Sequence, residues 1–217
     1  MSIKLLLADD HPVVREGIRS VIERTADDIE IIGEVSNGRE VMGFARKNLV
    51  DVYILDISMP ILNGIETTMK LIKMNPNNRI IILSIHDSRS FVEKTLYYGA
   101  KGYLLKESAV DEVIHAIHEV NKGRYYLSSA ITKYIVNGFL SGIHSLDINE
   151  DLVHLTERER EVLQLIAEGF TNKEIASNLN LAVNTVHVHR KNIMQKLDIH
   201  KHAGLIRYAI KEGIVKL

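Results

Sequence analysis

Five short apolar runs alternate with helical segments over the first 125 residues, and this alternation constrains the fold more than any other feature of the sequence. The runs are rich in Ile, Leu, Val and Tyr, and we predict strands at 3–8, 29–35, 52–55, 80–84 and 102–105. Their uninterrupted apolar character favours strands that are buried on both faces. Strands that alternate with helices form parallel sheets covered by helices on both sides. We therefore predict an α/β fold with a doubly wound, parallel, five-stranded sheet.

A different pattern follows this first domain, which we place at 1–125. Apolar residues recur at helical spacing between 131 and 139, and a serine and a glycine then lead into a polar, acidic run. Small residues, glycine and charge are typical of flexible linkers. We predict that residues 126–154 form a linker helix and a flexible tether.

Only helical patterns occur from residue 155 onward. Two capping boxes mark helix starts, Thr156 with Glu159 and Thr171 with Glu174. In such a box the threonine side chain accepts from free backbone N–H groups, and the glutamate reaches back to the cap. We predict a small all-α, four-helix domain at 155–217.

The charge is divided unequally along the chain. The net charge is −1, but residues 169–217 contain eight Lys or Arg against three acids, 8 − 3 = +5, which leaves −6 for the rest. A basic segment of this kind indicates a surface for nucleic acid or another polyanion.

The chain has no cysteine, which excludes disulfides and thiolate zinc sites and fits the reducing cytosol. No apolar run reaches the ~18 residues of a membrane span, and the start turns acidic too early for a signal peptide, so we expect a cytoplasmic protein without membrane contact.

Three carboxylates follow predicted strands, Asp9 and Asp10 after the first and Asp56 after the third. Ser84 ends the fourth strand, and Lys106 follows the fifth. Because the carboxyl ends of parallel strands meet at one edge of a sheet, we expect these side chains to converge. Clustered carboxylates repel one another, and Mg²⁺ with oxygen ligands is the simplest neutraliser. A metal, a hydroxyl and an ammonium group beside a nucleophilic carboxylate suit the transfer of a phosphoryl group to that carboxylate.

These residues, with Met-Pro at 59–60, Asn-Gly at 63–64 and the run GYLLK that ends at Lys106, resemble the flavodoxin-like receiver domain of two-component response regulators. The resemblance covers residues 3 to 122. It implies that Asp56 is the phosphoacceptor, that Asp10 binds the metal directly and that Asp9 binds it largely through water.

The same resemblance assigns roles around the phosphoacceptor. The backbone carbonyl of Ser58 would supply another metal oxygen, and Ser84 and Lys106 would contact the phosphoryl group. Tyr103 would be the switch aromatic, which rotates into the space that Ser84 vacates when it is drawn inward. Many receivers have proline after the lysine, whereas Glu107 stands here, and we predict a trans bond because a non-proline cis bond costs about 2.5–4 kcal/mol.

Residues 171–197 have the pattern of two helices joined by a tight turn at 180–182. This is the helix-turn-helix unit, whose second helix enters the major groove of DNA. With Val186, Ile193 and Leu197 facing inward, donors such as Lys191 must point outward, towards phosphates and base edges.

The segment from residue 155 to about 214 resembles the LuxR-type four-helix DNA-binding domain. With a receiver in front, the chain is similar to the NarL/FixJ class of response regulators. The resemblance implies that His187, Val188 and Lys191 contact DNA bases. It implies that Thr185, Arg190 and Asn192 lie near the DNA backbone. Two positions depart from the pattern, since His187 stands where lysine is frequent and Ala182 where a serine or threonine cap is usual.

The implied function is a transcription factor that is not an enzyme, apart from its own phosphorylation and dephosphorylation at Asp56. A sensor histidine kinase would be the phosphodonor, double-stranded DNA the target and RNA polymerase a further partner, and the phosphorylated protein would be a homodimer. One alternative is a phosphatase or phosphotransferase of the haloacid-dehalogenase kind, but that kind needs a second aspartate two residues after the nucleophile, where Pro12 stands here. Another is a regulator that works without phosphorylation, or that reads a protein partner through its helical domain.

Overall fold

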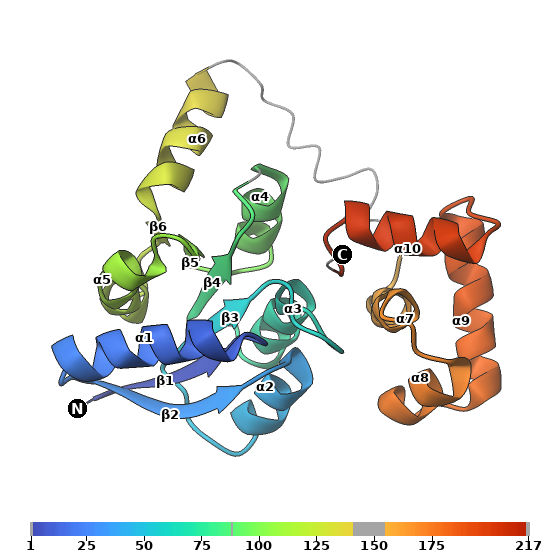
Figure 1. The fold of residues 1–217 in the computed structure, drawn as a ribbon, viewed down its shortest axis with the longest axis horizontal. Helices are drawn as coiled ribbons and strands as arrows, with labels where there is room; N and C mark the ends of the chain where they lie inside the picture. Colours follow the sequence, from blue (N-terminus) through green and yellow to red (C-terminus); the bar gives the residue numbers. More distant parts are fainter. Residues whose placement is uncertain (1, 88, 141–154, 216–217) are drawn as a thin grey trace. The chain divides into compact units, whose positions relative to one another are not determined.

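The computed structural model of the protein describes residues 2–87, 89–140 and 155–215 (Figure 1). The chain divides into two compact units, an N-terminal one built around a sheet and a C-terminal one made of helices. The tether predicted within 141–154 lies outside the described residues. No helix in these ranges is long and apolar enough to cross a membrane.

A parallel sheet forms the centre of the N-terminal unit. Its strands are β1 (Ile3–Ala8), β2 (Ile29–Val35), β3 (Val52–Asp56), β4 (Ile80–Ser84), β5 (Gly102–Leu105) and β6 (Tyr126–Leu127). Among the described residues their order is β2-β1-β3-β4-β5-β6, and every neighbouring pair is parallel. The strand order reverses between β1 and β3, so the carboxyl ends of these two strands flank a crevice where ligand sites form in such sheets.

The sheet differs from the prediction at both of its edges. The expected number of five strands is wrong, because β6 adds a sixth in the described chain and pairs Tyr126 with Gly102 and Leu127 with Tyr103. Two residues are too few to show a strand pattern in the sequence. Burial on both faces was also predicted for β2, and this is wrong, since only Ile29 is buried there. As an edge strand, β2 is covered by fewer neighbours than the central strands.

Helices cover both faces of the sheet (Figure 1). α1 (Pro12–Thr25) and α5 (Ala109–Asn121) bury Ile18, Ile22 and Ile117 against one face. The helices on the other face are α2 (Gly38–Ala45), α3 (Gly64–Met74) and α4 (Arg89–Tyr97). α5 ends as expected just before Gly123, whose φ of 82° is a conformation that glycine adopts without strain.

The predicted linker helix is present as α6 (Ser129–Leu140). Its first turns belong to the N-terminal unit, because Ile131 is fully buried in the same hydrophobic cluster as Val92 of α4 and Tyr103 of β5. Ile135 packs against this cluster as well. The beginning of α6 is thus part of the core beside β5.

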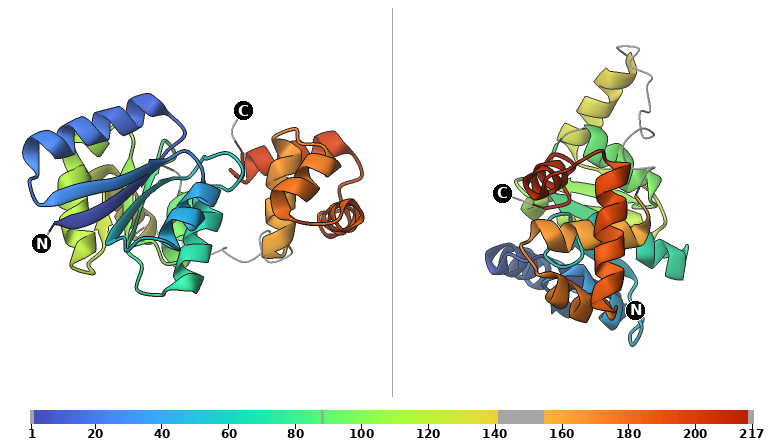
Figure 2. Two further views of the ribbon diagram at one scale, coloured as in Figure 1. Left: turned by 90° about the horizontal axis from the view of Figure 1, so that it is seen from below. Right: turned by 90° about the vertical axis from the view of Figure 1, so that its right-hand side faces the viewer.

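The described part of the C-terminal unit consists of α7 (Glu157–Ala167), α8 (Asn172–Leu179), α9 (Val183–Lys196) and α10 (His202–Lys211), which Figure 2 shows from two further directions. Both predicted capping boxes are confirmed at the starts of α7 and α8. Asn180 takes the left-handed conformation in the turn between α8 and α9. The helices share one core, which includes Val162, Leu163, Ile175, Val186, Ile193 and Leu205.

Candidate functional site

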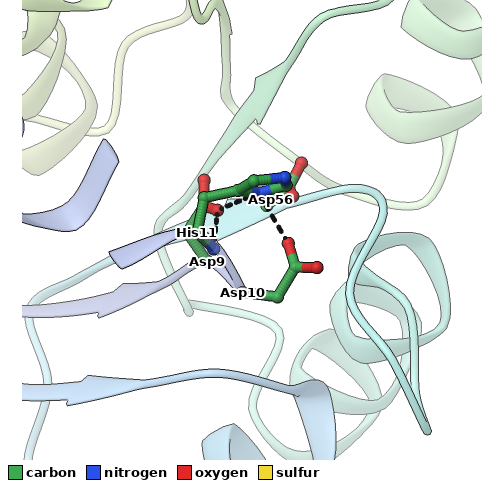
Figure 3. Close-up of side chains that lie close together, drawn as sticks. All are labelled: Asp9, Asp10, His11 and Asp56. Carbon is green, nitrogen blue, oxygen red and sulfur yellow. Dashed lines mark hydrogen bonds and ion pairs between the residues drawn. The ribbon is translucent and has the colours of Figure 1, made fainter. Parts of the chain in front are cut away.

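The three predicted carboxylates meet where β1 and β3 end. Asp9 and Asp10 follow β1, Asp56 is the last residue of β3, and Figure 3 shows their side chains close together with that of His11. One ligand atom from each of these four residues lies within 4.8 Å of the others. Asp9 is fully buried and Asp56 is 1% exposed, whereas the Asp10 side chain is 30% exposed. The group therefore opens to solvent on the side of Asp10.

Lys106 lies beside the two buried carboxylates. Its Nζ is 2.7 Å from Asp9 Oδ2 and 2.9 Å from Asp56 Oδ2. Burial by itself would lower the pKa of Lys106, but the charges of Asp56 and Asp9 and the hydrogen bonds to both outweigh burial and raise the pKa. The ammonium group therefore stays charged, and it offsets part of the repulsion between the carboxylates.

Ser84 and Tyr103 are linked through one backbone residue, His86. The N–H of His86 donates to Ser84 Oγ at 2.9 Å, and the hydroxyl of Tyr103 donates to the carbonyl oxygen of His86 at 2.7 Å. Tyr103 is fully buried, and burial raises the pKa of its hydroxyl to about 12. The aromatic ring, which we predicted to rotate inward, already lies in the core in this structure.

His11 is a further member of this group of side chains. Its Nδ1 is 3.0 Å from Asp9 Oδ1 and 2.8 Å from Asp10 Oδ1. The histidine stands directly after the two aspartates and just before α1, so its place in the sequence was the available signal. Its ring connects the buried carboxylate with the exposed one at the mouth of the site.

The loop after Asp56 holds β3 against α3. Ser58 is buried in this loop, and Asn63 accepts from the N–H of Glu66 at 2.9 Å to cap α3. The N–H of Gly64 donates to the carbonyl oxygen of Ile57 at 2.8 Å. A side chain at Gly64 has no room, because its Cβ would press against the backbone of Asp56 and Ile57. On the other side of the site, the bond between Lys106 and Glu107 is trans, as predicted.

The second candidate site is the outer face of α9. Val186 and Ile193 are buried, so the opposite side of the helix faces solvent, as predicted. Three of the residues predicted to contact DNA are exposed: His187, Val188 and Lys191. The other three, Thr185, Arg190 and Asn192, are half-buried. Ala182 precedes the helix without a side-chain cap, which matches its departure from the usual serine or threonine.

Side chains of neighbouring helices contact this face. Asn172 Nδ2, at the start of α8, is 3.3 Å from His187 Nε2, and Arg190 Nη2 is 2.9 Å from His202 Nδ1, at the start of α10. A shallow hollow on the same face is lined by His187, Arg190, Lys191, Met194, Gln195, Ile199 and His200. Asn172, His200 and His202 could not be predicted at this face from the sequence, because their proximity to α9 depends on how the helices pack.

Comparison with known proteins follows the same division into two units. Residues 5–118 match the family model described as the response regulator receiver domain, and residues 153–209 match that of the bacterial regulatory proteins of the luxR family. The chain is 39% identical over 213 residues to the transcriptional regulatory protein MctR of Rhizobium johnstonii, and this alignment covers 98% of this chain and 95% of MctR. It is 36% identical over 212 residues to the response regulator UvrY of Escherichia coli, in an alignment that covers 98% of this chain and 95% of UvrY.

Solved structures of RcsB are similar along the whole chain. RcsB from Salmonella enterica serovar Typhimurium, bound to the promoter P1flhDC in the presence of phosphomimetic BeF3⁻, has a TM-score of 0.59 at 26% identity, covering 96% of this chain and 98% of RcsB. A structure of two RcsB dimers on two parallel DNAs has a TM-score of 0.57 at 29% identity, with the same coverage of 96% and 98%. These relatives are regulators, which argues against the haloacid-dehalogenase alternative. The chain belongs to the response regulators that join a receiver domain to a LuxR-type DNA-binding domain and regulate transcription.

Proposed function

We propose that a sensor histidine kinase phosphorylates Asp56 in a Mg²⁺-dependent reaction, and that this modification controls dimerisation and DNA binding. The observation that carries the proposal is the position of Lys106, which lies within 2.9 Å of both Asp9 and Asp56 in a buried group of carboxylates. Such a cation beside a nucleophilic carboxylate is suited to bind phosphoryl oxygens during phosphoryl transfer.

The chemistry requires one bond to form and one to break. An Asp56 carboxylate oxygen attacks the phosphorus of the kinase phosphohistidine, the new O–P bond forms, and the P–N bond breaks so that its electron pair returns to the imidazole. Lys106 holds a phosphoryl oxygen, and the hydroxyl of Ser84 donates to another. The resulting acyl phosphate is lost again by hydrolysis, the only other reaction that we assign to the chain.

A divalent cation fits the donor set of this pocket. Asp9, Asp10 and Asp56 offer carboxylate oxygens within 4.8 Å of one another, and hard oxygen ligands suit Mg²⁺. The backbone carbonyl of Ser58 would add a further oxygen. When bound, the cation offsets negative charge on the phosphoryl group. Lys106, which is 2.9 Å from Asp56 Oδ2, then helps to orient the reacting carboxylate of Asp56.

The output of the switch is DNA binding by α9. We propose that Lys191, Val188 and His187 face bases, and that Thr185, Arg190 and Asn192 lie near the DNA backbone. RcsB, which is similar over nearly the whole chain, binds DNA as dimers, and this supports a phosphorylated homodimer here. DNA and the ATP that kinases use are both in the cytoplasm, so we propose that the protein works there and meets RNA polymerase on promoters.

The direct test uses beryllofluoride with Mg²⁺, which mimics the aspartyl phosphate. We expect the dimer fraction and the DNA affinity of the full chain to rise, the affinity by roughly 5- to 150-fold, as for a typical allosteric coupling. Sedimentation velocity and fluorescence anisotropy with a promoter fragment measure the two quantities. Removal of Mg²⁺ with EDTA should reverse both. If neither quantity changes, the proposed control by phosphorylation is wrong.

A charge substitution on α9 tests the DNA-binding face. Because we propose that Lys191 faces a base, we expect Lys191→Ala to weaken binding to a promoter fragment about tenfold and to reduce the preference for that fragment over unrelated DNA. If Lys191 contacts a phosphate instead, the affinity should fall equally for all sequences, and the slope of log affinity against log salt should decrease by about 0.9. Lys211→Ala, at the exposed end of α10, is the control with the same charge change. Equal losses in both variants would contradict the assignment of the DNA surface to α9.

A further inference from the structure

The segment after α5, which contains β6 and Ser128, is hydrogen-bonded directly to Tyr103, the proposed switch residue. In the β5–β6 pair the N–H of Tyr126 donates to the carbonyl oxygen of Lys101 at 2.9 Å, and the N–H of Ser128 donates to the carbonyl oxygen of Tyr103 at 3.0 Å. Tyr103 is therefore held at two points, through its hydroxyl by His86 and through its carbonyl by Ser128. Figure 1 shows that α6 begins directly after β6.

These hydrogen bonds form a continuous series from the phosphorylation site to α6. Ser84 Oγ accepts from the N–H of His86, and the carbonyl of His86 accepts from the Tyr103 hydroxyl. The carbonyl of Tyr103 accepts from the N–H of Ser128, and the carbonyl of Ser128 accepts at 2.9 Å from the N–H of Thr132 in the first turn of α6. No bond in the series is longer than 3.0 Å, so a shift of one member must either carry its neighbour along or break the bond between them.

The same residues are packed in the core. Tyr103, Ser128 and Ile131 are all fully buried, and Ile131 shares a hydrophobic cluster with Tyr103. Among the described residues Ser128 Oγ has no hydrogen-bond partner, so a polar group is buried here without the bond that would stabilise it. α6 also contacts α4 on the same side of the sheet. Densely packed groups of this kind change between discrete arrangements and do not deform gradually.

We infer that β6 and the first turn of α6 are the output element of the receiver: a shift of Ser84 and Tyr103 moves Ser128 and Ile131, and α6 moves with them. α6 is the last described helix before residues 141–154, which lead to the DNA-binding unit. The inference rests on the proposed function and adds the route by which phosphorylation leaves the N-terminal unit. Ser128 and Ile131 are positioning residues in this route, since neither contacts the phosphoryl group.

The test compares two isoleucine-to-alanine variants of the full chain. Among the described residues, Ile131→Ala removes most of the one fully buried α6 side chain in the Tyr103 cluster and leaves only the partly buried Ile135 there, whereas Ile117→Ala truncates an equally buried isoleucine of α5 in the cluster on the other face of the sheet. We measure acyl phosphate formed from acetyl phosphate and the DNA affinity with and without beryllofluoride. Both variants should be phosphorylated at the wild-type rate within about twofold, because neither residue lies in the pocket. For Ile131→Ala the ratio of the two DNA affinities should fall close to one, while Ile117→Ala should keep the wild-type ratio.

A second measurement does not depend on a destabilising substitution. In the wild-type chain, hydrogen exchange at the amides of Ser128 and Thr132 should change when beryllofluoride and Mg²⁺ are added.

A milder substitution serves if Ile131→Ala does not fold. Ile131→Val, which removes one methyl group, should reduce the ratio of the two DNA affinities partially.

Three results would overturn the inference. They are a wild-type ratio in Ile131→Ala, an equal loss in Ile117→Ala, and unchanged exchange at Ser128 and Thr132. A wild-type chain that fails to respond to beryllofluoride in DNA binding would instead contradict the proposed function, and the inference with it.

Discussion

Asp56→Asn is expected to form no acyl phosphate with acetyl phosphate or with a phosphorylated kinase. An amide oxygen is a much weaker nucleophile than a carboxylate oxygen, and the substitution also removes one of the anionic oxygens that would hold Mg²⁺. Intact-protein mass spectrometry and Phos-tag electrophoresis measure the product. The DNA affinity of this variant should not respond to beryllofluoride, because a neutral amide has no anionic oxygen to bind beryllium.

The control for this prediction lies at the other end of the same strand. Asp51 directly precedes β3, whereas Asp56 ends it, so the two aspartates lie at opposite ends of the strand. The carboxylate of Asp51 accepts from the N–H of Lys4 at 2.8 Å. Asp51→Asn keeps an acceptor oxygen and should be phosphorylated as the wild type is. Phosphorylation of Asp56→Asn at the wild-type level would show that another residue is the acceptor. The fold should survive in both variants, since in Asp56→Asn the ammonium group of Lys106 keeps Asp9 as its partner at 2.7 Å.

Gly64→Ala is expected to destabilise the N-terminal unit by about 3 kcal/mol, at the upper end of the cost of overpacking. The new Cβ would press against the carbonyl oxygen of Asp56, 2.9 Å from its carbonyl carbon and 3.0 Å from Cα of Ile57. All three atoms belong to the backbone and cannot rotate away. The start of α3 must then separate from β3, which also displaces Asp56. Thermal unfolding followed by circular dichroism should show a midpoint lower by roughly 10 °C.

Gly17→Ala provides a matched glycine in the same unit. Gly17 lies inside α1, and a Cβ built there meets no atom within 4 Å. Alanine should therefore raise stability by about 0.5–1 kcal/mol, because it limits the freedom of the unfolded chain and favours a helix. The two substitutions should change the midpoint in opposite directions. A Gly64→Ala variant as stable as the wild type would mean that α3 and β3 do not approach as closely as the structure indicates.

Local patterns account for much of what could be predicted. The apolar runs correctly predicted the strands from β1 to β5, and the threonine–glutamate pairs predicted the capping boxes of α7 and α8. These features depend on residues within a few positions of one another. The convergence of Asp9, Asp56 and Lys106 could also be predicted, although these residues are far apart in sequence, because a parallel sheet brings the carboxyl ends of its strands to one edge.

The sequence by itself therefore determined the two domains, the pocket and the buried and exposed sides of α9. Only the tertiary structure decided that Tyr126 and Leu127 pair with β5, that His11 contacts both Asp9 and Asp10, and that Arg190 meets His202. Such contacts join side chains or short segments that have no periodic pattern of their own. Their formation depends on which backbone groups and surfaces the assembled core leaves open. For this reason the series from Ser84 to α6 becomes visible only once the sheet and its helices are in place.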